Sequence, residues 1–204
     1  MTSINAGELI SAVMGSEAGG EGLGQRALFG LTKAFRRDRT TTTLEPVIDP
    51  QEAFRRGIAL GQQGDVEGAR AAYQQAIDSG DAGYAPAAGY HLGLLLGQHD
   101  DIDGAREAYR QAANSSHPEY GPTAARNLGH LHKRQGRHRQ AIAAYQVAAD
   151  SGHPDVAPWA MLYLGNLFRY LGNPADARAS YQGAVDSGHP KAGPQAARQL
   201  ADLP

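Results

Sequence analysis

One pattern of residues recurs four times in this chain, at a step of 36 residues and without gaps. The copies span 50–85, 86–121, 122–157 and 158–193, each opens on a proline, and a fifth copy begins at Pro194 and stops early. Four positions hold one residue type in every copy: Gly57, Gly93, Gly129 and Gly165; Ala69, Ala105, Ala141 and Ala177; Tyr73, Tyr109, Tyr145 and Tyr181; Ala76, Ala112, Ala148 and Ala184. A repeat of this length predicts an array of units that bury their apolar faces against their neighbours.

Each copy is predicted to form a pair of antiparallel helices, as the second copy shows. Its first helix should span about 86–98, because a proline suits the first turn of a helix and leucines follow at helical spacing. A second helix should span about 102–114, with Asp101 or Asp103 accepting from the free N–H groups at its start. We expect the small residues Gly93 and Ala105 to mark the closest approach of the two helices.

The pattern Leu92-Gly93, Ala105, Tyr109 and Ala112 resembles the tetratricopeptide repeat. The third and fourth copies match it at the equivalent positions, whereas the first copy has Arg56 in place of the leucine. Two features depart from the family: its usual repeat has 34 residues, and the proline near the end of the second helix comes one place late, at Pro118, Pro154 and Pro190. The tail of each copy also resembles Sel1-like repeats.

The resemblance implies an all-α fold, a right-handed α-solenoid of four helical hairpins over residues 46–204. We expect a closing helix over 194–203 and, over residues 1–45, a helical extension and linker. In that extension, the spacing of apolar residues predicts an amphipathic helix over 21–37 and a short helix over 3–14. The amphipathic helix either caps the first repeat, or is presented to a partner or a second copy, or docks weakly on a membrane surface.

The resemblance also implies a concave groove, lined by the first helix of each hairpin, that holds a peptide or protein segment. Counted from the opening proline, the lining positions 2, 5, 9, 12 and 13 change along the array from apolar to basic and aromatic. Together with neighbouring polar residues, they give these candidate binding residues: Tyr90, Leu94, Arg126, Asn127, His130, Lys133, Arg134, Trp159, Leu162, Asn166, Arg169, Tyr170 and Arg198.

The distribution of charged residues also differs along the array. Between Tyr120 and Ala149 there are basic residues and no acidic one, namely Arg126, Lys133, Arg134, Arg137 and Arg139. Such a run is either a solvated face or a cradle for an acidic segment, since arginine offers a fork of donors that matches a carboxylate. Some tetratricopeptide repeat proteins hold a terminal carboxylate with a Lys and Asn set, but this chain does not match that set position by position, so we predict no such clamp.

The composition and motifs favour an interaction protein over an enzyme. The chain has no cysteine and a net charge of -2, and it has no apolar run of the roughly 18 residues that span a membrane. No Ser-His-Asp set, phosphate-binding loop or HExxH motif is present, and His117, His153 and His189 should lie too far apart to share a metal ion. We therefore expect a non-catalytic, cytoplasmic adaptor or scaffold of bacterial origin, without a cofactor and without membrane contact.

Three alternatives for the partner stay open. The first is a peptide or protein segment of acidic character, held in the groove. The second is a structural role as a homo-oligomer, in which arrays stack end to end or the N-terminal helix of one chain fills the groove of another. The third is nucleic acid bound through residues 126–139, which the near-neutral net charge disfavours.

Overall fold

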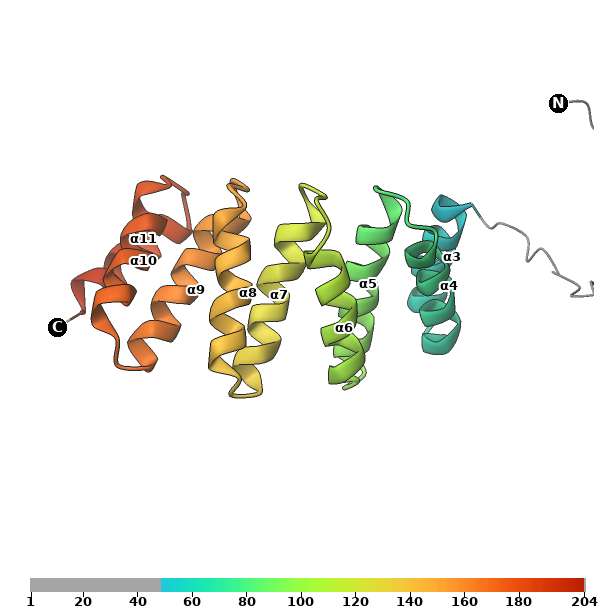
Figure 1. Cartoon of the computed structure of the whole chain (residues 1–204), viewed down its shortest axis with the longest axis horizontal. Helices are drawn as coiled ribbons and strands as arrows, with labels where there is room; N and C mark the ends of the chain where they lie inside the picture. The colour runs from blue at the N-terminus through green and yellow to red at the C-terminus, as the bar shows by residue number, and fades with distance from the viewer. Residues whose placement is uncertain (1–48, 204) are drawn as a thin grey trace, which may run out of the picture. The chain divides into compact units, whose positions relative to one another are not determined.

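The computed structural model describes residues 49–203, which form a row of α-helices without a β-strand (Figure 1). The helices pair as hairpins in chain order: α3 (Pro50–Gln62) with α4 (Val66–Asp78), α5 (Tyr84–Gln98) with α6 (Ile102–Ala113), α7 (Tyr120–Arg134) with α8 (His138–Asp150), and α9 (Val156–Tyr170) with α10 (Pro174–Asp186). A last helix, α11 (Ala192–Ala201), packs on α9 and α10. The prediction of four stacked hairpins and a closing helix is confirmed, whereas the predicted N-terminal helices lie outside the described residues.

The first helices of the hairpins form the inner side of the array. Each of α3, α5, α7 and α9 packs against the next first helix in the row, and α11 takes that place after α9. Within the described residues, by contrast, none of the second helices α4, α6, α8 and α10 packs against another second helix. The first helices are therefore closer to one another than the second helices are, and their free surfaces share one face, which we call the inner face.

A tyrosine of the second helix packs on a glycine of the first helix in every hairpin. A Cβ atom placed on Gly93 would lie 2.5 Å from the ring of Tyr109, and the glycines of the other three copies face their own tyrosine rings in the same way. The four rings are buried, at most 6% exposed. Of the two small residues predicted at the closest approach of the helices, Gly93 faces the ring of Tyr109, and Ala105 lies opposite Gly97.

The first helices of the later copies begin two residues before their proline. α5 begins at Tyr84 and α11 at Ala192, whereas the sequence predicted Pro86 and Pro194. The proline stays within the first turn, where its missing N–H leaves no helical hydrogen bond unmade. The extra residues become helical because a side chain of the return loop accepts from the free N–H groups of this turn, as the following paragraph describes.

A histidine in the return loop caps the start of three first helices. Nδ1 of His153 accepts from the backbone N–H groups of Asp155 and Val156, each at 3.2 Å, and His117 and His189 do the same one repeat away. In the first return loop, the carboxylate of Asp81 takes this role. Because Nδ1 accepts, the proton of each neutral ring is on Nε2, and Nε2 of His153 lies 3.0 Å from a carboxylate oxygen of Glu119 in the preceding loop. These repeated histidines are structural caps.

Candidate functional site

Two hollows open on the inner face, and most of the sequence-predicted binding residues line one or the other. The α5–α7 hollow has a volume of about 220 Å³ and is lined by Leu94, Gly97, Gln98, Tyr109, Asn127, His130, Leu131 and Arg134. The α7–α11 hollow is larger, about 500 Å³, and is lined by Lys133, Asn166, Arg169, Tyr170, Gln195 and Gln199. Together these two hollows form the candidate site.

The candidate site includes residues that the sequence reasoning missed. Gln195 and Gln199 lie on α11 and face the α7–α11 hollow, but the prediction chose only Arg198 from this helix. Gln195 is position 2 of the truncated fifth copy, so the position count used for the complete copies would have found it. Tyr109 was not among the predicted binding residues, yet from the second helix α6 it lines the α5–α7 hollow.

One predicted groove residue is a core residue. Leu162 is only 1% exposed and packs in a cluster with Tyr181 of α10 and Ala196 of α11. Its equivalents Tyr90 and Arg126 are half-buried, so they keep part of their surface on the inner face. Because α11 covers this end of the array, Leu162 is withdrawn from the surface and does not contact a ligand there.

The remaining predicted residues lie on the array but outside the two hollows. Trp159 is half-buried, and its ring lies 6.0 Å from the rings of both Tyr163 and His189. The ring of Tyr90 packs between those of Tyr109 and Tyr120, at 6.3 and 5.7 Å. Arg198 is exposed on α11.

Hydrogen bonds from buried tyrosines fix polar side chains in the floor of the site. The hydroxyl of Tyr181 donates to Oδ1 of Asn166 at 2.9 Å, and that of Tyr145 lies 2.8 Å from Nδ1 of His130. Burial lowers the pKa of His130 to about 4, and the nearby Arg126 and Lys133 add to the effect. His130 is therefore neutral at pH 7. The positive charge of the site consequently comes from its Arg and Lys side chains alone.

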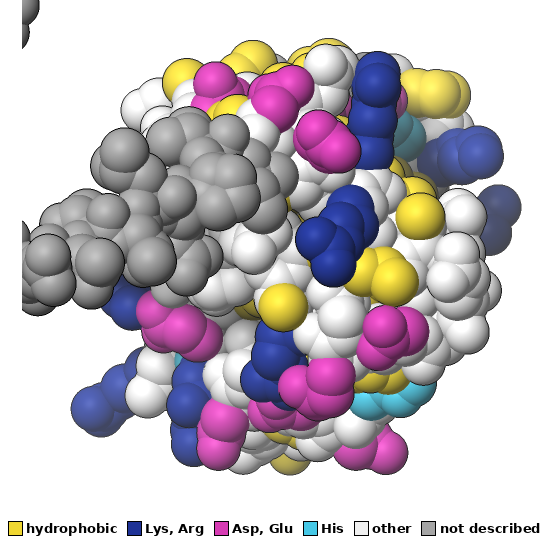
Figure 2. All heavy atoms as spheres, turned by 90° about the vertical axis from the view of Figure 1, so that its right-hand side faces the viewer, with side chains coloured by type: hydrophobic (Ala, Val, Ile, Leu, Met, Phe, Trp, Pro, Cys, Tyr) yellow, Lys and Arg dark blue, Asp and Glu magenta, His cyan; other side chains and the backbone are white. Residues whose placement is uncertain are grey.

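Those cations are not neutralised within the array. Among residues 49–203, no ion pair joins Arg126, Lys133, Arg134 or Arg169 to a carboxylate. In the first two repeats the arginines of the second helices are paired instead, as in the 2.6 Å contact between Arg70 and Asp101. The end of the array at the first hairpin shows basic and acidic side chains interspersed (Figure 2). Within the described part of the chain, Arg126, Lys133, Arg134 and Arg169 thus carry positive charge that no ion pair compensates.

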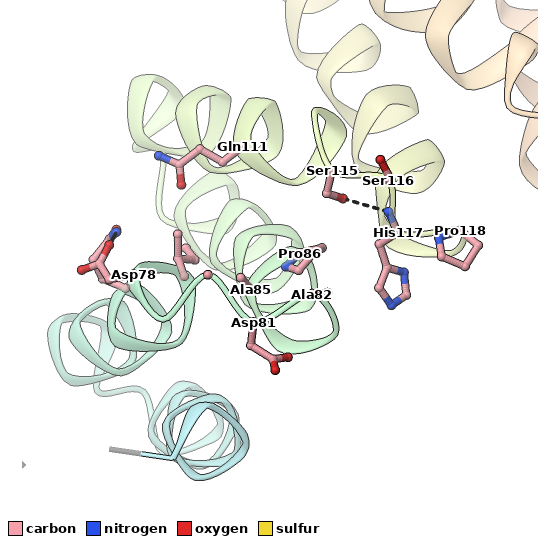
Figure 3. Close-up of a pocket in the computed structure, with 13 residues that line it drawn as sticks. Asp78, Asp81, Ala82, Ala85, Pro86, Gln111, Ser115, Ser116, His117 and Pro118 are labelled. Carbon is pink, nitrogen blue, oxygen red and sulfur yellow. Dashed lines mark hydrogen bonds between the residues drawn. The ribbon is translucent and has the colours of Figure 1, made fainter. Parts of the chain in front are cut away.

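A second kind of hollow lies between successive return loops, on an edge of the array away from the candidate site. The hollow in Figure 3 has a volume of about 550 Å³ and brings Asp78, Asp81 and Pro86 together with His117 and Pro118 of the next loop. An equivalent hollow one repeat later, about 670 Å³, places the return loop of His117 beside that of His153. Neither is lined by Lys or Arg, so the chemistry of this edge differs from that of the inner face.

Neither a metal site nor a membrane span is found in the part of the chain that the structure describes. No three His, Asp or Glu side chains between residues 49 and 203 are grouped so that they could hold a metal ion. None of the helices described is both long enough and apolar enough to cross a bilayer.

Comparison with known proteins agrees with this geometry. The family model described as "Tetratricopeptide repeat" matches residues 54–120 and 126–197. Two crystal structures of MamA are similar, with TM-scores of 0.56 and 0.54 and identities of 19% and 18%; they cover 79% and 75% of this chain and 86% and 84% of their own. A tetratricopeptide repeat protein from Parabacteroides merdae ATCC 43184 has a TM-score of 0.58 at 16% identity, over 74% of this chain and 58% of its own. No curated protein sequence matches significantly.

Proposed function

Because the chain belongs to the tetratricopeptide repeat family, we propose that it is a non-catalytic interaction module that holds an acidic peptide or protein segment on its inner face. Arrays of this family generally serve protein–protein interaction or assembly and are generally not catalytic. The finer part of the proposal concerns where the segment binds and why it is acidic.

The observation that carries the proposal is the unpaired positive charge of the α7–α11 hollow. Lys133 and Arg169 line it together with the amide groups of Asn166, Gln195 and Gln199, and no acidic side chain does. Oδ1 of Asn166 is already engaged by Tyr181, so the Asn166 amide presents its N–H donors to a ligand. The hollow is therefore rich in donors and positively charged, which suits the oxygens of a carboxylate.

The length of the inner face supports an extended segment over a small anion. The α5–α7 hollow, one repeat away, shares the helix α7 with the α7–α11 hollow and adds apolar surface from Leu94 and Leu131 beside Arg134. A peptide that spans both hollows would place an acidic residue on Lys133 and Arg169 and an apolar side chain near Leu94. Acidic charge sets orientation and association rate, whereas apolar burial adds affinity.

Charge reversal in the hollow tests the proposal directly. We expect Lys133→Glu/Arg169→Glu to weaken binding of a fluorescent acidic peptide by roughly tenfold or more, since this corresponds to the loss of one charge-assisted hydrogen bond. The variant Arg126→Glu/Arg169→Glu should weaken it in the same direction. Fluorescence anisotropy gives the dissociation constants, and circular dichroism checks that the helices are intact.

The control makes the same change of charge at the other end of the array. Arg55 and Arg56 are exposed on α3, and Arg55→Glu/Arg56→Glu should change the affinity less than twofold once the salt concentration screens distant charges. Equal losses in the two double variants would show that net charge, not the hollow, attracts the peptide, and would refute the proposal. A single-stranded oligonucleotide that displaces the peptide at lower concentration, with a steep dependence on salt, would favour the nucleic-acid alternative.

Self-assembly through the N-terminal residues stays a prediction, because residues 1–48 lie outside the described part of the chain. Light scattering of the full chain beside a 46–204 fragment measures it. A mass that falls from oligomer to monomer on truncation would support assembly through the N-terminal helix. A monomer in both cases would reject it.

A further inference from the structure

Two large apolar side chains are exposed next to each other at the rim of the α7–α11 hollow. Tyr170 is the last residue of α9 and is 73% exposed, and Leu171 after it is 43% exposed. Among residues 49–203, Val147 on α8 is the other large apolar side chain with comparable exposure. Tyr170 also lines the hollow itself, so an exposed aromatic ring stands directly beside the cations Lys133 and Arg169.

The repeat shows that Tyr170 is not needed for folding. The equivalent positions in the other copies are the polar or charged residues Gln62, Gln98 and Arg134, all exposed. The ring of Tyr170 has one aromatic neighbour, His138, at 5.5 Å between ring centroids, and most of its surface is open to solvent. An aromatic side chain placed at a position where the scaffold requires none is suited to a role in contact with a partner.

The lining side chains of the hollow offer hydrogen-bond donors. Lys133 and Arg169 are cations, and the amide groups of Asn166, Gln195 and Gln199 add N–H donors. A ligand that satisfies these donors carries negative oxygens, as the carboxylate of an acidic residue does. Oε1 of Gln199 is buried below this surface and out of reach of a ligand.

We propose that the α7–α11 hollow recognises an acidic residue adjacent to an aromatic residue in one peptide segment. The carboxylate binds Lys133 and Arg169, and the aromatic ring of the ligand stacks on Tyr170. This inference rests on the proposed function and adds a sequence requirement to it: acidic charge alone gives weaker binding than acidic charge next to an aromatic ring.

Three short peptides test the requirement on the full chain. One is acidic with a central tryptophan, the second has alanine in place of the tryptophan, and the third is its neutral counterpart, in which Asn and Gln replace Asp and Glu around the tryptophan. We expect the acidic tryptophan peptide to bind about fivefold more tightly than the acidic alanine peptide, within the range of one aromatic contact. The neutral tryptophan peptide should bind more weakly than both.

Variants of the protein assign the effect to Tyr170. Tyr170→Ala should abolish the difference between the two acidic peptides, and Tyr170→Phe should preserve it, because stacking needs the ring and not the hydroxyl. Val147→Ala, at an exposed apolar residue of α8, serves as the matched control and should leave all affinities unchanged.

The outcomes separate this inference from the proposed function. If both acidic peptides bind equally and Tyr170→Ala changes neither, the aromatic requirement is wrong while acidic recognition stands. If neither acidic peptide binds but the neutral tryptophan peptide does, both the requirement and the proposed function are wrong.

Discussion

The second and third repeats pack in the same way, but their variable positions carry side chains of different charge and polarity. Both pack a tyrosine ring on a glycine, Tyr109 on Gly93 and Tyr145 on Gly129. At the positions that vary, apolar or acidic residues of the second repeat are replaced by basic or polar ones in the third. The replacements are Tyr90 to Arg126, Leu94 to His130, Leu96 to His132, Gly97 to Lys133, Gln98 to Arg134, Asp101 to Arg137 and Asp103 to Arg139.

Several of these replacements reduce the stability of the third repeat. In the second repeat, Asp101 caps α6 by accepting from the N–H of Gly104 at 2.9 Å, and this bond and Arg70 hold the pKa of Asp101 below its usual range. Arg137 makes no side-chain cap for α8. His132 is buried at a position where the second repeat has a leucine, and its Nδ1 has no hydrogen-bond partner among residues 49–203. The comparison indicates that the third repeat lacks stabilising contacts that the second repeat has.

The largest change in stability should come from replacing the glycine on which the tyrosine ring packs in both repeats. A methyl group on Gly93 would overlap the ring of Tyr109, so we expect Gly93→Ala to lower the free energy of unfolding by about 3 kcal/mol, and Gly129→Ala to lower it by a similar amount. Urea unfolding measures both.

The control for this prediction lies one turn further along the same helix. A Cβ atom on Gly97 would lie 3.8 Å from that of Ala105, an ordinary contact, so Gly97→Ala should raise the free energy of unfolding by up to about 1 kcal/mol. If only one of Gly93→Ala and Gly129→Ala lowers the free energy of unfolding, the two repeats do not pack in an equivalent way.

Acid should destabilise the chain through the buried histidines of the third repeat. The pKa of His130 is about 4 in the folded protein and about 6.5 in the unfolded chain. The unfolded chain therefore binds the proton first, and the contribution of His130 to stability is complete above pH 6.5 and falls as the pH approaches 4. Between pH 7.5 and pH 5 this amounts to a loss of roughly 2 kcal/mol.

The fourth repeat supplies the matched variant for this test. Asn166 accepts from Tyr181 at the position equivalent to His130, so His130→Asn should keep a hydrogen bond to Tyr145 and remove the titration. The residual acid dependence then comes from other groups, including His91 and His132, whose pKa values burial also lowers. An acid dependence unaltered in His130→Asn, measured by urea unfolding at both pH values, would contradict this role.

A side-chain cap introduced at the start of α8 should stabilise the third repeat. Arg137→Asp places at the start of α8 the residue type that caps α4 and α6, and we expect a gain of about 1 kcal/mol in the free energy of unfolding. Arg137 lines neither hollow, so peptide affinity at moderate salt should change little. A tenfold loss of affinity would show that Arg137 takes part in binding, contrary to this prediction.

The smallest change in stability should come from the turn between the two helices of a hairpin, where the second repeat has an aspartate and the other repeats have a glycine. Asp100 has a φ of 59°, whereas the equivalent residues Gly64, Gly136 and Gly172 are glycines with positive φ. Asp100→Gly should stabilise the chain by a few tenths of a kcal/mol, since glycine adopts this conformation without strain but loses more entropy on folding. A thermal unfolding series beside Gly136→Asp, which should destabilise the third repeat, gives the comparison.

The repeat pattern predicted the scaffold because all four copies indicate the same pair of helices. The spacing placed the two helices of each copy and offered Asp101 or Asp103 as the cap of the second helix; in the structure Asp101 is the cap. The first helix α3 begins at Pro50, as predicted, but the later first helices begin two residues before their proline. Their capping by Asp81, or by His117 and its equivalents, depends on a loop conformation that spacing alone does not reveal.

The candidate site was less predictable because it depends on how the array ends. Counting positions placed Lys133, Asn166, Arg169 and Tyr170 on one face, and the structure brings them to one hollow. The same count assigned Leu162 to that face, but α11 covers it. The contribution of Gln195 and Gln199 likewise depends on the packing of α11 against α9, which a truncated copy signals only weakly.

The central claim is that an acidic segment binds on the inner face of the third and fourth repeats, and side-chain amide signals in NMR test it most directly. Titration of the full chain with the acidic tryptophan peptide should shift the signals of Asn127, Asn166, Gln195 and Gln199 in a saturable way. Those of Gln62, Gln63, Gln74 and Gln75 in the first repeat should stay in place. Shifts confined to the first repeat, or none at saturating peptide, would contradict the account.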